Sequence, residues 1–266
     1  MLRVLALLVT SVAFVRVNGT PLQPKGDPPQ DLGRIVGGEE TTIDKFPYQV
    51  GIRFLGAFHC GGSIFSSNIV ITAAHCIYNF PPALLSVFAG TSSRTEGGIK
   101  RDIQRFIWHE DFDKDTSESD IGLIILEGHL DFSKTIQPIA LASEGETIPP
   151  GTRAYISGWG TLEDDGNLAE SLYSASVTII DNLVCAKAYI GIVSITASMI
   201  CASGEPYGGT APCIGDYGGP LVAGGKVYGY VSWKDKCSEF SLPQIYSNVA
   251  NLRTWIDANI KKYSSY

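Results

Sequence analysis

The sequence predicts an all-β domain, either a sandwich or a barrel, that ends in one helix. From Ile35 onward, short apolar or alternating segments are separated by clusters of Gly, Pro, Asn and Asp, as in such folds. These segments are residues 48–54, 63–72, 121–126, 154–158, 174–180 and 227–232. Near the end of the chain, apolar residues recur every three or four positions, which predicts an amphipathic helix over about 249–263. They are Val249, Leu252, Ile256, Ile260 and Tyr263.

The first 34 residues form two segments that precede this domain. Residues 1–19 combine a basic residue, Arg3, with an apolar run over 4–15 and small residues near the end, which is typical of a cleaved secretory signal. The alternative, a transmembrane helix, needs about 20 apolar residues. Residues 20–34 are rich in proline and polar side chains, which predicts an unstructured leader. We therefore expect a secreted, extracellular protein whose domain spans 35–266.

Cysteine content and charge limit the partners of the chain. Six cysteines behind a secretory signal predict three disulfides, with fifteen pairings open. There is no C-x-x-C pair and there are four histidines, so we expect no metal and no cofactor. The net charge is −7, which repels phosphate backbones and excludes nucleic acid as a partner. No second apolar segment of spanning length follows, so we expect no membrane contact, and we expect a monomer.

Four motifs occur in order along the domain: RIVGG at 34–38, TAAHC at 72–76, DIGLIIL at 120–126 and GDYGGP at 215–220. In this order they resemble the trypsin family of serine proteases, and the resemblance covers 35–266. It implies two packed antiparallel six-stranded β-barrels with the active site in the cleft between them. The first barrel is then expected over about 35–143, the second over about 144–248, and the C-terminal helix after them. The resemblance also implies three disulfides: Cys60 to Cys76, Cys185 to Cys201, and Cys213 to Cys237.

The resemblance implies a catalytic triad with one altered member. In it, His75 is the general base and Asp120 is the carboxylate that fixes its tautomer. Tyr217 stands where the family has its nucleophilic serine. Its phenol has a pKa near 10 and lies on a long, rigid side chain. We expect its ring to crowd the space where an oxyanion would form against the N–H of Gly215.

The resemblance further implies an occluded specificity pocket. Ala211 replaces the aspartate that trypsins pair with a basic substrate side chain. Lys234, which follows Ser232 and Trp233, replaces a glycine, and Gln244 replaces another. Because glycines at such places leave room for a ligand, we expect Lys234 and Gln244 to fill the pocket and its entrance.

The activation machinery, by contrast, resembles that of the family. Arg34 and Ile35 form an expected cleavage site, after which the Ile35 ammonium can pair with Asp216. Beyond Gly90, the segment TSSRTEGGIK lacks the spaced acidic ligands that calcium requires, so no calcium site is expected.

Together these features favour a secreted protein-binding module that is not an enzyme. The altered position 217, the filled pocket and the cysteine pattern are similar to the inactivated serine protease paralogues of scabies mites. That resemblance implies extracellular host-defence proteins such as complement components as partners, with complement inhibition and immune evasion as the role. Alternatives remain: an accessory factor in a protease cascade, a storage or digestive protein, or a weakly active peptidase that uses Ser232 or a water activated by His75. A peptidase needs an open pocket, whereas a binding module does not.

Overall fold

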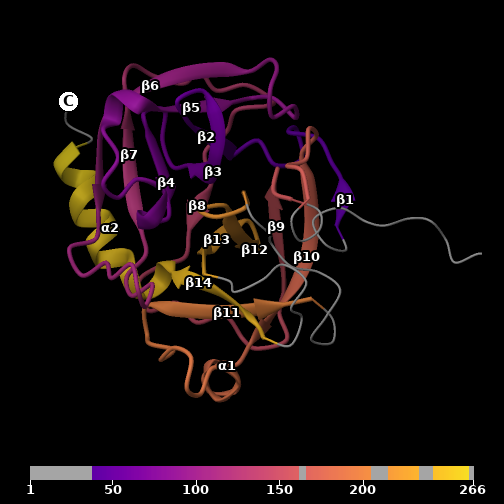
Figure 1. Cartoon of the computed structure of the whole chain (residues 1–266), viewed down its shortest axis with the longest axis vertical. Coiled ribbons are helices and arrows are strands. Elements are labelled where there is room, and N and C mark those ends of the chain that lie inside the picture. The colour runs from indigo at the N-terminus through magenta and orange to yellow at the C-terminus, as the bar shows by residue number, and fades with distance from the viewer. Residues whose placement is uncertain (1–37, 162–165, 205–214, 234–241, 264–266) are drawn as a thin grey trace, which may run out of the picture. The chain divides into compact units, whose positions relative to one another are not determined.

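The computed structural model describes residues 38–161, 166–204, 215–233 and 242–263. These residues form two six-stranded β-barrels and a C-terminal helix, as Figure 1 shows. The all-β fold with two antiparallel barrels is therefore confirmed. Within the described residues, no helix is both long and apolar enough to span a membrane.

The first barrel is closed in the strand order β2-β3-β4-β7-β6-β5. Its strands are β2 (Gln49–Phe54), β3 (Ala57–Ile64), β4 (Ile69–Thr72), β5 (Leu85–Ala89), β6 (Ile99–Trp108) and β7 (Gly122–Leu126). Two short 3₁₀ helices, η1 (Ala74–Cys76) and η2 (Pro82–Leu84), lie between β4 and β5. Branched apolar side chains such as Val50, Ile52 and Ile64 fill the interior, as expected for strands with one face buried.

The second barrel follows the order β10-β11-β14-β13-β12-β9 and is closed by the pairing of β9 with β10. Its strands are β9 (Arg153–Gly158), β10 (Tyr173–Ile180), β11 (Met199–Ser203), β12 (Pro220–Ala223), β13 (Lys226–Trp233) and β14 (Gln244–Asn248). Two short strands extend this sheet: β1 (Glu39–Glu40) pairs with β10, and β8 (Ala140–Leu141) pairs in parallel with β13.

The C-terminal helix α2 (Val249–Tyr263) matches the predicted span. Its buried residues Val249, Leu252 and Ile256 share one apolar cluster with strands of both barrels. Through Ile71 on β4 and Val227 on β13, this cluster continues from one barrel to the other. The helix thus packs against strands of both barrels.

Two local predictions differ from the structure. Residues 63–72 do not form one strand, because β3 ends at Ile64 and a turn over 65–68 leads into β4. A second α-helix, α1 (Asn182–Ala188), was not predicted. Its N-cap is Asp181, whose carboxylate accepts hydrogen bonds from the N–H groups of Leu183 and Val184.

Candidate functional site

The centre of the site is a histidine–carboxylate pair at the edge of the first barrel. Thr72 at the end of β4 pairs with Gly122 at the start of β7. Residues just beyond these strand ends therefore lie together. His75 Nδ1 lies 2.7 Å from Asp120 Oδ2, and the backbone N–H of His75 donates to Asp120 Oδ1 at 2.9 Å. The carboxylate thus fixes the orientation of the imidazole. The other ring nitrogen, Nε2, lies 3.6 Å from Cys76 Sγ.

Asp120 is fully buried and is held by groups from the second barrel. Ser232 on β13 donates to Asp120 Oδ2 at 2.5 Å, and the Ser247 hydroxyl on β14 donates to the Asp120 carbonyl. A buried carboxylate is stable only when hydrogen-bonded or paired, and here the two serine donors lie on strands while His75 lies on η1. The two barrels therefore build this site jointly.

The carboxylate determines the protonation of the base. Burial disfavours the imidazolium, but the Asp120 charge and its hydrogen bond outweigh burial and raise the pKa of His75 above its ordinary value. A histidine in this state can accept a proton and hold it as a cation next to Asp120. The pair keeps the geometry and electrostatics of a general base.

A disulfide and a second histidine border the base. Cys60 on β3 is bonded to Cys76, the residue after His75, which ties η1 to the barrel. His59 Nε2 lies 3.1 Å from the Cys76 carbonyl, and burial lowers the pKa of His59. His59 was not among the predicted site residues, because the TAAHC motif marks only His75. Since the Cys60 and Cys76 sulfurs are bonded to each other, they supply no thiolate for a metal.

Tyr217 occupies the position facing the base. Its ring stands edge-on to the His75 imidazole, with centroids 5.3 Å apart and planes at 87°. The ring contacts the apolar clusters of both barrels, and the Tyr217 carbonyl accepts a hydrogen bond from the Gly61 N–H at 2.7 Å. Burial, and to a lesser extent Asp216, raises the pKa of the phenol. The tyrosine is therefore a neutral aromatic wall of the cleft.

The loop before Tyr217 is shaped by glycines and a buried acid. Gly215 has a φ of 97°, and a Cβ there would lie 2.6 Å from Leu168 Cδ2. Asp216 is buried and accepts a hydrogen bond from the Gly160 N–H at 2.9 Å. A Cβ on Gly160 would meet the Asp216 carboxylate at 2.4 Å, so only glycine fits.

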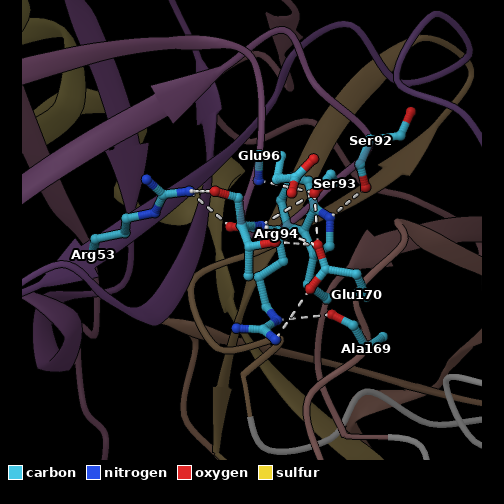
Figure 2. A network of polar contacts seen from close by, with 9 residues as sticks. Arg53, Ser92, Ser93, Arg94, Glu96, Ala169 and Glu170 are labelled. Carbon is cyan, nitrogen blue, oxygen red and sulfur yellow. Dashed lines mark hydrogen bonds and ion pairs between the residues drawn. The ribbon is translucent and has the colours of Figure 1, made fainter.

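A polar cluster that the sequence did not reveal joins Ser93 and Arg94 to Ala169 and Glu170 (Figure 2). Glu170 accepts hydrogen bonds from the hydroxyls of Ser93, at 2.6 Å, and Thr95, and pairs with Arg94 at 3.3 Å. Arg94 Nε also donates to the Ala169 carbonyl at 2.9 Å. Hydrogen bonds from Ser93 and Thr95 lower the pKa of Glu170. We call these five residues the Arg94–Glu170 clamp.

The clamp links the first barrel to the segment beside the loop. The Ala169 N–H donates to the Gly160 carbonyl at 3.3 Å, and Leu168 packs against Gly215. Contacts therefore run from Glu170 through residues 168–169 to the loop that carries Tyr217.

Of the predicted pocket residues, the structure describes three. Ser232 binds Asp120, and the Trp233 ring lies 5.7 Å from that of Tyr189. Gln244 is buried in β14, and its Oε1 has no hydrogen-bond partner among the residues that the structure describes. The remaining predicted site residues lie outside the described ranges: Arg34, Ile35, Ala211, Cys213, Lys234 and Cys237. The second predicted pair, Cys185 and Cys201, forms a disulfide that anchors α1 to β11.

Comparison with known proteins identifies similar chains. The family model described as Trypsin matches residues 35–256. Trypsin delta of Drosophila melanogaster is 40% identical over 255 residues, which cover 95% of this chain and 98% of that protein. The vitellin-degrading protease of Bombyx mori is 37% identical over 96% of this chain and 94% of its own length. The crystal structure of the scabies mite inactivated protease paralogue S-D1 is also similar, with a TM-score of 0.79, 29% identity, and coverage of 85% of this chain and 97% of that one.

These similarities contradict the expectation that the chain is not an enzyme. The curated relatives are named trypsins and a vitellin-degrading protease, and they match over nearly their full length. That expectation rested on four positions: Ala211, Tyr217, Lys234 and Gln244. The structure shows that the base is nevertheless assembled, because His75 and Asp120 are joined by two hydrogen bonds and the pKa of His75 is raised.

Proposed function

Since this chain belongs to the trypsin family of serine proteases, we propose that it is secreted and acts by binding another extracellular protein. The proposed partner class is host-defence proteins, with complement components as the first candidates. Secretion is supported by the composition of residues 1–19 and by two disulfides, which form in oxidising compartments.

The observation that carries the proposal is an exposed apolar surface, which we call the α1 surface. Leu183 and Val184 on α1 are 74% and 42% exposed, and Ile190 and Ile192 after it are 78% and 58% exposed. Ile190 and Ile192 line a groove of about 450 Å³ over residues 189–195. Exposed apolar side chains gathered in this way mark interaction sites in soluble proteins.

The α1 surface is held rigidly in place. The Cys185–Cys201 disulfide fixes α1 to β11, and the Tyr189 hydroxyl donates to the Pro243 carbonyl at 2.5 Å. A preorganised surface loses little conformational entropy on binding, which favours affinity. The similar scabies mite structure is described as an inactivated protease paralogue, which is consistent with a role in binding.

The test is inhibition of complement-dependent lysis of sensitised erythrocytes in plasma by the purified full chain. The proposal expects dose-dependent inhibition that is at least tenfold weaker for Ile190→Asp/Ile192→Asp. Leu55→Asp is the matched control, since Leu55 is also exposed, at 69%, but lies between β2 and β3. Lysis that is unaffected by the parent protein would rule out complement as the partner.

A second candidate function, peptide hydrolysis, is supported by the assembled His75–Asp120 pair and by the named activities of the relatives. Here the base would activate a water, since Tyr217 offers no aliphatic hydroxyl. The test is hydrolysis of chromogenic peptide amides by the parent and by His75→Ala purified in the same way. Hydrolysis that is lost in His75→Ala would show that this chain catalyses it. Equal hydrolysis in both samples would show that a contaminating protease catalyses it.

A further inference from the structure

A basic pocket lies where the end of α2 meets the first barrel. It has a volume of about 310 Å³ and is lined by Gln104 and Arg105 of β6, Ile125 of β7, and Lys262 and Tyr263 of α2. Figure 1 shows α2 running beside β7. We refer to these five residues as the α2 pocket.

Two cations converge on one aromatic ring in the α2 pocket. Arg105 Cζ and Lys262 Nζ each lie 5.2 Å from the centroid of the Tyr263 ring. Hydrogen bonding of both side chains to the Tyr263 hydroxyl, and to a lesser extent their positive charges, lower the pKa of this phenol. Cations at this distance from a ring are attracted to its face, so the ring holds both side chains at the pocket.

Carboxylates of the described chain do not neutralise these cations. In the described residues, neither Arg105 nor Lys262 forms an ion pair. The acids on the same two elements have other partners: Asp102 pairs with Lys100 at 2.8 Å, and Asp257 pairs with Arg253 at 2.8 Å. Two neighbouring positive charges repel each other, and a bound anion between them relieves that repulsion.

The other residues that line the α2 pocket indicate what kind of molecule the anionic group belongs to. Its volume lies at the lower end of the range for small-molecule sites, roughly 300–1,000 Å³, and exceeds what a lone oxyanion fills. Gln104 offers an amide that both donates and accepts, as sugar hydroxyls require. The Tyr263 ring and Ile125 offer apolar faces for sugar C–H groups. A charged group on a polyhydroxylated ring matches all five residues.

We propose that the α2 pocket binds a sulfate group carried by an acidic polysaccharide. Arg105 and Lys262 contact the sulfate, Gln104 contacts a sugar hydroxyl, and Tyr263 stacks on the sugar ring. The chain has a net charge of −7, which repels the parts of a polyanion that lie outside the pocket. A longer polysaccharide is therefore expected to bind no more tightly than a short fragment that fills the α2 pocket. This site is separate from the α1 surface and from the cleft.

The test is fluorescence anisotropy of a labelled heparin hexasaccharide titrated with the full chain. We expect saturable binding that weakens with salt, since charged contacts are screened. Arg105→Gln/Lys262→Gln is expected to lower the affinity at least tenfold, and Tyr263→Ala to lower it several-fold. The control Lys45→Gln/Lys134→Gln also removes two exposed positive charges and is expected to change the affinity less than twofold.

Three further ligands separate the sources of the anion. Inorganic sulfate is expected to compete only at concentrations at least tenfold above the hexasaccharide, and desulfated hexasaccharide is expected not to bind. Equal affinity for inorganic sulfate would show a free-ion site and overturn the proposal. So would equal affinity for a single-stranded oligonucleotide of the same charge, or equal losses in the control and pocket variants.

Discussion

The Tyr217 ring stands edge-on to the His75 imidazole, at 5.3 Å between centroids and 87° between planes, in the position facing the base. The tyrosine therefore packs on the residue that a serine at this position would hydrogen-bond. The imidazole therefore remains paired with Asp120, and the Tyr217 ring covers the side of it where a serine hydroxyl would lie.

Replacing Tyr217 with serine is expected to raise kcat/KM for peptide amides above that of the parent. The new Oγ would lie next to an assembled base, whereas Tyr217→Ala removes the same ring without supplying a nucleophile and serves as the control. We measure these kinetics on protein cleaved after Arg34. Equal activity of the serine and alanine variants would contradict the assignment of His75 as a base for position 217.

The same variant is expected to remain several orders of magnitude below an ordinary trypsin. Gln244, which the family resemblance places at the specificity pocket, is buried in β14, and displacing the scissile carbonyl by about 1 Å can cost roughly a hundredfold. Tyr217→Ser/Gln244→Gly is therefore expected to gain more than the two single changes indicate, because neighbouring sites couple. Trypsin-like turnover by Tyr217→Ser alone would show that the pocket accepts substrate as it is.

The His75–Asp120 pair makes the free energy of unfolding depend on pH. The folded-state pKa of His75 is raised above the unfolded value of 6.5, so its stabilisation is complete below that pH and is lost as pH rises through the folded-state pKa. Asp120→Asn is expected to lower the pKa of His75 in a ¹H–¹⁵N NMR titration and to remove this pH dependence.

His59→Gln serves as the control for that titration. It removes the neighbouring imidazole, whose pKa is lowered by burial, and leaves the Asp120 hydrogen bonds in place. The pKa of His75 is expected to remain raised in this variant. A pKa of His75 that is the same in Asp120→Asn and in the parent would show that the carboxylate does not set it.

Glu170→Gln is expected to lower the free energy of unfolding by about 1 kcal/mol. Glu170 is half exposed, so solvent screens its ion pair with Arg94 and that pair contributes little. Most of the loss is expected from the hydrogen bonds that the carboxylate accepts from hydroxyl groups. Its lowered pKa means that the contribution is present above the unfolded pKa of about 4.5 and is lost as pH falls. Urea unfolding at pH 7 and pH 3 measures both. Asp257→Asn, which removes an exposed pair within α2, is expected to cost about 0.3–0.5 kcal/mol. Equal effects at both pH values would contradict the role of the Glu170 carboxylate.

Those parts of the fold that depend on local sequence patterns could be predicted from the sequence. The three- to four-residue spacing in 249–263 and the β-type segments led to α2 and to most of the barrel strands, and the TAAHC and DIGLIIL motifs led to His75 and Asp120. The helix α1 has only seven residues, too few to show a period, although Asp181 is a capping residue that could have signalled its start.

The remaining parts depend on contacts between distant residues. Arg94 and Glu170 lie 76 positions apart, and nothing in either neighbourhood encodes their pairing. The packing of Tyr217 on His75 depends on the rotamer that the clusters of both barrels leave open, which no spacing rule predicts. The expectation that the chain is not an enzyme rested on residue identities at a few positions, and the similarity of the whole chain to named proteases overturns it.

Binding of purified complement proteins to the α1 surface tests the central claim most directly. Surface plasmon resonance with the immobilised full chain measures Kd for the parent, for Ile190→Asp/Ile192→Asp and for the control Leu55→Asp. We expect a micromolar or tighter Kd for at least one component, a loss of at least tenfold in the double variant, and a change below twofold in the control. Equal affinity of the parent and the double variant would contradict a role of the α1 surface, and an absence of binding by the parent would contradict the proposed function.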